Sequence, residues 1–340
     1  MSSGNRKNID DFISKIKSQQ RDKIDINDLF ERITKGDKAA LSKGITLVES
    51  TKSEDIPIAH QLLEKCLPFR KDTKRIAITG IPGVGKSTFI NSFAYQLAIS
   101  EKKVAVLSVD PSSSISKGSI LGDKTRMEDI AHLEQVYIRP TATGNTLGGV
   151  HLKTREVILL CEAAGYDHIL VETVGVGQSE YLVQSMTDIM IVMLLPGSGD
   201  SLQGIKRGIM EMADIILINK ADQFPEANIN QTVSDYKHAM HLLSAKPNQW
   251  TVQVLGSSAF DKDSIQSVIA SVEQYFNHII LNGFFDNQRL QQWQEWFASS
   301  IGWATTEVLK TKGIDLSKEV LNENELPPAK ALNAIKKLLH

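Results

Sequence analysis

Short apolar runs alternate with helical stretches from Arg75 to about Tyr275. The runs are rich in β-branched residues and are apolar at successive positions, as in strands that are buried on both faces. Alternation of strands and helices predicts an α/β fold with a mostly parallel central sheet flanked by helices. The seven runs read RIAIT, VAVLSV, VYIRP, HILVET, DIMIVMLL, DIILINK and WTVQVL.

The chain has a helical pattern on both sides of this region. Apolar positions recur at helical spacing over most of the first 70 residues, until Pro68 and the charged run RKDTKR. Helical spacing returns after Gly283. We therefore expect a helical N-terminal extension over residues 1–70, a central domain over 71–280 and a C-terminal helical arm over 281–340.

Four aromatic residues lie near one face of the helix predicted within the C-terminal arm. That face either packs on the parent domain or forms a dimerisation surface, because a helix that projects from a core must cover its tryptophans. The pattern alone leaves both possibilities open. The four residues are Trp293, Trp296, Phe297 and Trp303.

The composition is that of an ordinary soluble globular protein: 41% of the 340 residues are hydrophobic and 23% are charged. The formal net charge is −2 and the basic residues are scattered, so we expect neither nucleic acid nor membrane as a partner. The N-terminus has no apolar run typical of a secretory signal. Cys66 and Cys161 show no metal-ligand or redox spacing, and we expect two inert core thiols in a cytoplasmic protein.

A glycine-rich segment follows the strand RIAIT and precedes the helical run FINSFAYQLAI. It matches GxxxxGK[ST] in the strand–loop–helix context of a phosphate-binding P-loop, which makes the predicted fold that of a P-loop NTPase. Glycines let backbone N–H groups turn toward phosphates, and the helix N-terminus adds its positive dipole end. Lys86 can reach the β- and γ-phosphates, and the Ser87 hydroxyl can ligate magnesium. The segment comprises Gly80, Ile81, Pro82, Gly83, Val84, Gly85, Lys86, Ser87 and Thr88.

A second motif, Asn219-Lys220-Ala221-Asp222, stands at the end of the strand DIILI, where ligands bind in an open α/β sheet. Asp222 can accept two parallel hydrogen bonds from the guanine N1–H and exocyclic amine, a donor pair that adenine lacks. The Lys220 stem can cover the base plane, and Asn219 can tie this loop to the P-loop. These features favour GTP over ATP. The next strand leads to a loop whose backbone can donate to the guanine O6, at Ser257, Ser258 and Ala259.

Three acidic residues at strand ends or in the loops that follow them are candidate magnesium ligands together with Ser87. They are Asp110, Asp123 and Glu172. Mg²⁺ takes a few carboxylates with hydroxyl, phosphate and water oxygens. GTPases usually carry aspartate at the position of Glu172, in a DxxG pattern whose glycine, here Gly175, contacts the γ-phosphate. The longer glutamate places its carboxylate differently relative to the ion.

The usual water-orienting glutamine is missing from its position after this glycine. Small GTPases carry it directly after the glycine, where this chain has Val176, and the first glutamine is Gln178. We therefore expect slow intrinsic hydrolysis that a partner accelerates.

Motifs along nearly the whole chain resemble the MeaB/ArgK/MMAA family of GTPases. They include GIPGVGKST, VDPSS, LGDKTRM, RPTATGNTLGGV, ETVGVGQSE, PGSGDSLQGIKRGI, NKAD and SSA. The resemblance implies a homodimeric GTPase that uses GTP, GDP and Mg²⁺ as a chaperone of an adenosylcobalamin-dependent methylmalonyl-CoA mutase or a related acyl-CoA mutase. Such a chaperone gates cofactor loading and protects the mutase from inactivation, and the C-terminal arm would be its dimerisation arm.

The resemblance also implies an extra switch over the loop from Pro196 to Arg207, which would sense the nucleotide and contact the mutase. Within it, Lys206 is a candidate for stabilising transition-state charge, together with the catalytic residues Lys86 and Glu172; a solvated lysine is the alternative interpretation. Two departures from the family pattern lie outside the nucleotide motifs, in the run Thr141–Asn145 and at Ser201 after Asp200.

Two further functions remain open at the level of sequence. A kinase would pass the phosphate to a protein or small molecule, and it needs an acceptor pocket and an aspartate base that no motif indicates. A nickel metallochaperone GTPase would carry clustered Cys or His near the nucleotide. His238 and His241 are three residues apart, but no third ligand is evident.

Overall fold

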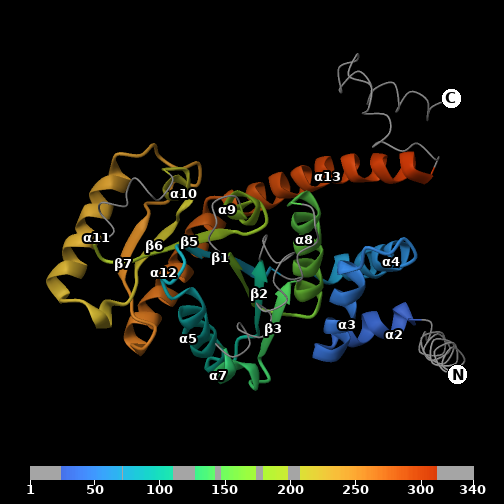
Figure 1. Ribbon diagram of the computed structural model, residues 1–340, viewed down its shortest axis with the longest axis horizontal. Coiled ribbons are helices and arrows are strands. Elements are labelled where there is room, and N and C mark those ends of the chain that lie inside the picture. Colours follow the sequence, from blue (N-terminus) through green and yellow to red (C-terminus); the bar gives the residue numbers. More distant parts are fainter. Residues whose placement is uncertain are drawn as a thin grey trace, which may run out of the picture. The chain divides into compact units, whose positions relative to one another are not determined.

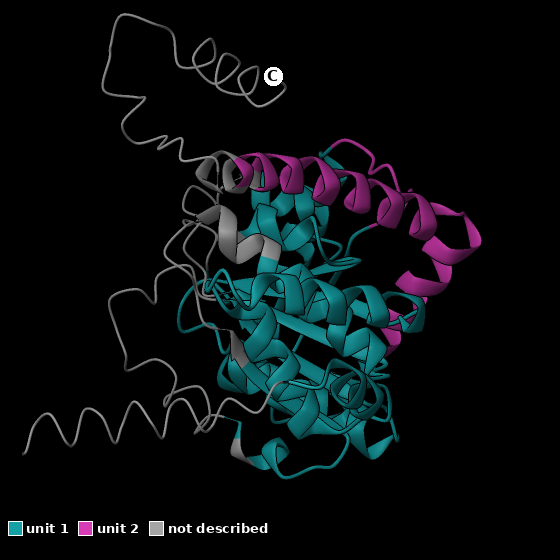
Figure 2. Ribbon diagram, turned by 90° about the vertical axis from the view of Figure 1, so that its right-hand side faces the viewer, with its two compact units in different colours: residues 1–243, 252–269 teal, residues 244–251, 270–340 magenta. Residues whose placement is uncertain are grey.

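The computed structural model describes residues 24–70, 72–109, 127–141, 147–173, 179–197 and 207–311. The chain divides into two compact units, which Figure 2 colours separately. Unit 1 comprises the described residues of Met1–Leu243 and Val252–Ile269, and unit 2 those of Ser244–Thr251 and Ala270–His340. The domain boundaries expected at residues 70 and 280 stay predictions.

Unit 1 is built on a seven-stranded sheet in which every described strand pairing is parallel. The strand order is β3-β2-β4-β1-β5-β6-β7 (Figure 1). Six strands fall within their apolar runs or differ from them by a residue at an end, whereas β7 begins three residues into the run WTVQVL and ends one residue after it. Seven parallel strands between helices confirm the predicted fold class. The strands are β1 (Lys74–Gly80), β2 (Val104–Val109), β3 (Val136–Thr141), β4 (His168–Thr173), β5 (Ile189–Leu194), β6 (Ile215–Ile218) and β7 (Gln253–Gly256).

Helices flank this sheet, and β2, β4, β5 and β6 are buried at every residue. Burial on both faces explains why these strands are continuously apolar instead of alternating. The helical elements that follow the strands are α5 (Lys86–Ile99), α7 (Glu128–Ala131), α8 (Leu147–Ala163), α9 (Ser179–Gln184), α10 (Arg207–Met212), the 3₁₀ turn η3 (Ala221–Gln223), α11 (Glu226–His241) and α12 (Lys262–Leu281).

The strand order reverses direction at β1, which lies between β4 and β5. From β1 the chain builds β2, β3 and β4 on one side and β5, β6 and β7 on the other. In open α/β sheets, ligands bind beyond the carboxyl ends of the strands at such a switch point. The P-loop follows β1, so the topology sets it at that point.

Three aspartates hold neighbouring strands together at the amino ends of β4, β5 and β6. Each directly precedes its strand and accepts a hydrogen bond from a backbone N–H of the adjacent strand or of the residue before it. The donors are Lys103 for Asp167 at 2.8 Å, Arg75 for Asp188 at 2.9 Å and Met190 for Asp214 at 2.9 Å. These bonds fix the register between neighbouring strands, and therefore the alignment of their carboxyl ends.

The N-terminal part of unit 1 is a small helical bundle, as expected from the sequence. Its elements are α2 (Ile26–Thr34), α3 (Lys38–Glu49), α4 (Ile56–Cys66) and the 3₁₀ turn η1 (Leu67–Phe69). Helices α2, α3 and α4 pack against one another and against α8. Gly44 makes close packing possible, because a Cβ there would lie 2.8 Å from Ile33 Cδ1 and 3.4 Å from Leu62 Cδ2.

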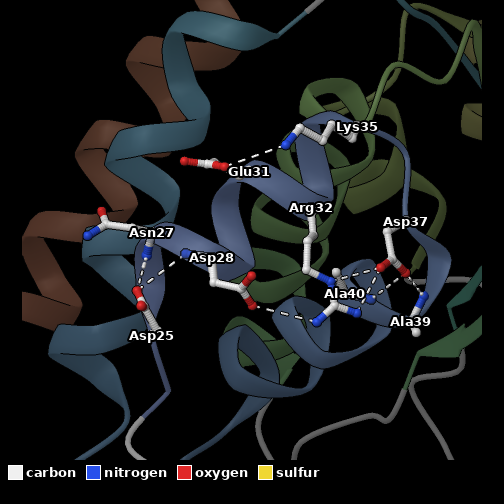
Figure 3. Close-up of polar contacts among 9 residues, drawn as sticks. All are labelled: Asp25, Asn27, Asp28, Glu31, Arg32, Lys35, Asp37, Ala39 and Ala40. Atoms are coloured by element: carbon white, nitrogen blue, oxygen red, sulfur yellow. Dashed lines mark hydrogen bonds and ion pairs between the residues drawn. The ribbon is translucent and has the colours of Figure 1, made fainter.

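Aspartate caps define where α2 and α3 begin (Figure 3). The Asp25 carboxylate accepts from two backbone N–H groups of α2, and Asp37 does the same for Ala39 and Ala40 of α3. Arg32 adds an ion pair with Asp37 at 2.8 Å. The Ala40 N–H and the Arg32 guanidinium hold the pKa of the Asp37 carboxyl below its usual range.

Polar contacts join this bundle to strand β3. Arg139 of β3 forms an ion pair with Glu49 of α3 at 2.7 Å, and burial raises the pKa of that glutamate against the effect of the arginine. The Ser42 and Tyr137 hydroxyls are 3.0 Å apart. The bundle therefore supports the edge of the sheet.

Unit 2 contains the second half of α12 and the long helix α13 (Phe284–Thr311). Trp250 packs edge-on against Tyr275 and also contacts His278, with ring centroids 5.3 and 5.5 Å apart. The helices are separated at Gly283, whose φ of 73° suits glycine. Among the side chains of α13 that the structure describes, five large apolar ones are exposed: Leu290, Trp293, Phe297, Ile301 and Val308.

Cys66 and Cys161 are both buried free thiols, as expected. Burial raises the pKa of Cys66 to about 12 and also raises that of Cys161, which disfavours the reactive thiolate at both positions. No described helix is both long and apolar enough to cross a lipid bilayer.

Replacing Asp214 by alanine should destabilise unit 1 by about 1–3 kcal/mol, because the buried Met190 N–H would lose its acceptor. Asp214→Asn keeps an acceptor oxygen and should cost less. Urea unfolding followed by circular dichroism measures both. Equal stability of the alanine variant and the parent would show that this hydrogen bond contributes nothing.

Candidate functional site

Three glycines of the P-loop are required by geometry. A Cβ at Gly80 would lie 2.5 Å from the Met193 carbonyl oxygen of β5, and one at Gly85 would lie 2.8 Å from Asn219 Nδ2. Gly83 and Gly85 have φ of 78° and 99°, which L side chains rarely adopt. Among the described residues, no atom lies within 4 Å of a Cβ at Gly83, so only backbone conformation selects glycine there.

Lys86 begins α5 and points back into the loop. Its ammonium donates to the carbonyl oxygens of Gly80 at 2.8 Å and Ile81 at 3.3 Å, and the side chain is buried. Burial lowers the pKa of Lys86, while the carboxylates of Glu172 and Glu180 act in the opposite direction. The ammonium therefore lies within the loop where phosphates are expected, at the N-terminus of a 14-residue helix.

The structure brings Ser87 and Glu172 together, although 85 residues separate them. The Ser87 hydroxyl donates to Glu172 Oε1 at 3.0 Å, and the Ser108 hydroxyl lies 3.5 Å from Oε2. Glu172 is buried at the end of β4. A hydroxyl and a buried carboxylate are hard oxygen donors, so this pair fits a magnesium ion beside the phosphates.

The predicted tie between the base loop and the P-loop is present. Asn219 Nδ2 donates to the Val84 carbonyl at 2.7 Å, and Asn219 is 2% exposed. Lys220 adopts a left-handed conformation with φ of 59°, and its Cε lies 3.8 Å from the position of a Cβ at Gly85. Its stem thus runs beside the P-loop, where it can cover one face of a base.

The loop after β7 is held by hydrogen bonds to β6, η3 and α12. Ala221 N–H donates to the Ser257 carbonyl at 3.0 Å, which sets this loop beside η3, where Asp222 is exposed. Ser257 and Ser258 N–H groups donate to Ile218 O at 2.8 Å and Ser264 Oγ at 2.9 Å. Of the three candidates for guanine O6, only the Ala259 N–H makes no hydrogen bond within the described residues.

Sequence reasoning missed Glu180. It lies on α9, which packs against β1 and β4, and it is 2% exposed and close enough to Lys86 to affect its pKa. The next residue, Tyr181, places its hydroxyl against Gly208 of α10, where a Cβ would collide with it. The ETVGVGQSE motif contained Glu180, but nothing in its spacing from Glu172 indicated burial.

Four of the predicted site residues lie outside the described residues: Asp110, Asp123, Gly175 and Lys206. The same holds for Val176 and Gln178. Their roles stay predictions.

A family model described as Methylmalonyl Co-A mutase-associated GTPase MeaB matches residues 41–312. The chain belongs to this MeaB family. It is therefore a P-loop GTPase whose fold binds guanine nucleotides. The family is associated by name with methylmalonyl-CoA mutase.

Curated relatives match most of the chain. GTPase ArgK of Escherichia coli is 44% identical over 78% of this chain and 80% of its own length. A putative GTPase of Caulobacter vibrioides is 43% identical, over 85% of this chain and 88% of the relative. The mitochondrial methylmalonic aciduria type A homolog of Mus musculus is 37% identical over 92% of this chain and 79% of its own.

A solved structure shares the fold of this MeaB family member. The crystal structure of a LAO/AO transport system kinase superposes with a TM-score of 0.72 at 33% identity. The match covers 94% of this chain and 98% of the other.

If Glu172 holds magnesium, Glu172→Gln should raise the Mg²⁺ concentration for half-maximal GTP hydrolysis by about tenfold or more. The glutamine amide keeps an acceptor for the Ser87 hydroxyl. The change in magnesium requirement therefore reports the loss of the negative charge alone. Ser108→Ala, which removes only the longer contact, serves as the control. An unchanged magnesium requirement in Glu172→Gln would exclude Glu172 as a ligand.

Proposed function

We propose that this chain is a GTP-hydrolysing chaperone that gates adenosylcobalamin loading and protects methylmalonyl-CoA mutase or a related acyl-CoA mutase. The observation that carries the GTPase part is the joining of three loops into one site: the P-loop, the Asn219–Asp222 loop and the loop at Ala259. The mutase part is supported by the family and by the name of its mammalian relative.

In the proposed reaction, water attacks the γ-phosphorus in line with the leaving GDP oxygen. The new bond to the water oxygen forms as the bond to the β–γ bridging oxygen breaks, giving GDP and phosphate. The Lys86 ammonium moves from the Gly80 and Ile81 carbonyls to the β- and γ-phosphate oxygens and neutralises developing charge. Ser87 and Glu172 would hold Mg²⁺, which supplies further neutralisation of the phosphate oxygens when bound.

Hydrolysis by the chain alone is proposed to be slow. The position after Gly175 is Val176, which cannot orient a water as glutamine does. The mutase partner would then complete the site, with Lys206 as a candidate cation for transition-state charge. Slow hydrolysis suits a chaperone in which the lifetime of bound GTP sets the lifetime of the complex with the mutase.

We further propose that the protein acts in the cytoplasm as a homodimer formed through α13. Its exposed apolar residues recur at spacings of three, four and seven, from Leu290 through Trp293, Phe297 and Ile301 to Val308. Such spacing sets them near one face of a helix, which suits a second copy of the same helix. Light scattering of the purified chain gives the oligomeric state directly.

GTP hydrolysis should accelerate by a factor on the order of 10 or more when a cobalamin-dependent acyl-CoA mutase from the same source is added. Lys86→Ala should abolish both basal and stimulated rates, because it removes the only cation that the structure holds among the described P-loop residues. Phosphate release measures the rates.

Lys237→Ala is the matched control, since it removes an exposed lysine of α11 and should behave as the parent. The absence of both acceleration and complex formation would contradict the chaperone proposal and leave a GTPase with another client. Transfer of the phosphate to an added substrate instead of water would favour a kinase.

A further inference from the structure

Phe260 is an exposed aromatic residue at the edge of the base site. Exposure rises along this loop: Ser257 is 0% exposed, Ser258 is 3% exposed and Ala259 is half-buried. Phe260 follows them and is 77% exposed. Leaving a phenylalanine ring in water forgoes the free energy of its burial. The exposed ring is therefore free to cover the flat face of a ligand, and such contact would recover part of that free energy.

The backbone holds Phe260 in a fixed position. Its N–H donates to Ser258 Oγ at 3.2 Å, and the next residue, Asp261, donates to the Ser258 carbonyl at 3.3 Å. The Asp261 carboxylate then caps α12 by accepting from the backbone N–H groups of Asp263 and Ser264, at 3.1 and 3.3 Å. An aromatic residue on such a fixed turn loses little conformational freedom when it binds a flat partner.

The surroundings of Phe260 point to a purine base. The preceding residue, Ala259, carries the N–H that remains for the guanine O6. The hydrogen bond from Ala221 N–H to the Ser257 carbonyl keeps the loop beside Asp222. On the P-loop side, the Lys220 stem can cover one face of a base. Phe260 follows Ala259 on the loop that lies beside Asp222.

We propose that Phe260 stacks on the guanine base of the bound nucleotide, opposite the Lys220 stem. This inference rests on the proposed binding of guanine nucleotides and adds the residue that supplies base affinity. Hydrogen bonds to Asp222 and Ala259 select guanine, whereas stacking on Phe260 contributes affinity without regard to the exocyclic groups, because every base has a π-face. The ring thus affects GTP and GDP equally.

The test is a set of binding titrations with GDP, with GTP in the presence of EDTA, and with inorganic tripolyphosphate as a probe that lacks a base. Phe260→Ala should weaken GDP and GTP binding by the same factor, about tenfold, and leave tripolyphosphate binding unchanged. Phe260→Trp should restore the affinity, and its indole fluorescence should change on addition of GDP but not of tripolyphosphate.

Leu242→Ala is the control, because Leu242 is an exposed apolar residue of the same unit, 87% exposed at the end of α11. It should bind all three ligands as the parent does. GDP affinity of Phe260→Ala within twofold of the parent would overturn the inference and assign the ring to another partner. An equal loss of affinity for GDP and for tripolyphosphate would also overturn it, because it would show that the substitution disturbs the loops as a whole. Failure of the parent to bind GDP would instead refute the proposed function.

Discussion

The hydrogen bond from the Asn219 amide to the Val84 carbonyl is the constraint on which the candidate site depends. It joins a loop after β6 to the P-loop after β1 across 135 residues of sequence, at 2.7 Å and in a buried position. Gly85 is part of the same constraint, because any Cβ there would collide with the Asn219 amide. With the two loops joined, the distance between phosphate and base subsites is fixed, as recognition of a whole nucleotide requires.

The sheet supplies the platform that makes this constraint possible. β1 and β6 are both neighbours of β5, so their carboxyl ends emerge close together at the switch point. Aspartates at the amino ends of β4, β5 and β6 bind the adjacent backbone and hold the register. On the other side of β1, β4 brings Glu172 to Ser87. Site geometry is therefore a consequence of strand order and register.

The local patterns of the sequence were sufficient for the seven strands, the P-loop and the Asn219 tie, because β-branched runs and glycine spacing are read within a few residues. Local patterns could not predict hydrogen-bond partners, strand ends or burial that depend on residues distant in the sequence. Only Ala259 of three candidate donors remains for a ligand, since Ser264 and Ile218 occupy the other two. Likewise, the apolar run predicts Trp250 in the last strand, but β7 begins at Gln253 and Trp250 packs against Tyr275 in unit 2. The burial of Glu180 depends on the packing of α9 and could not be predicted from its motif.

We propose that the Asn219–Asp222 loop recognises the guanine of a nucleotide whose phosphates lie in the P-loop. The most direct measurement is calorimetric titration of Asp222→Asn with GDP and with xanthosine diphosphate. Asparagine offers one acceptor and one donor in place of two acceptors, which matches the N1–H and 2-oxo group of xanthine. If Asp222 binds guanine in this way, the variant should lose about a hundredfold or more in GDP affinity and gain xanthosine diphosphate binding. Unchanged preference for GDP would contradict it.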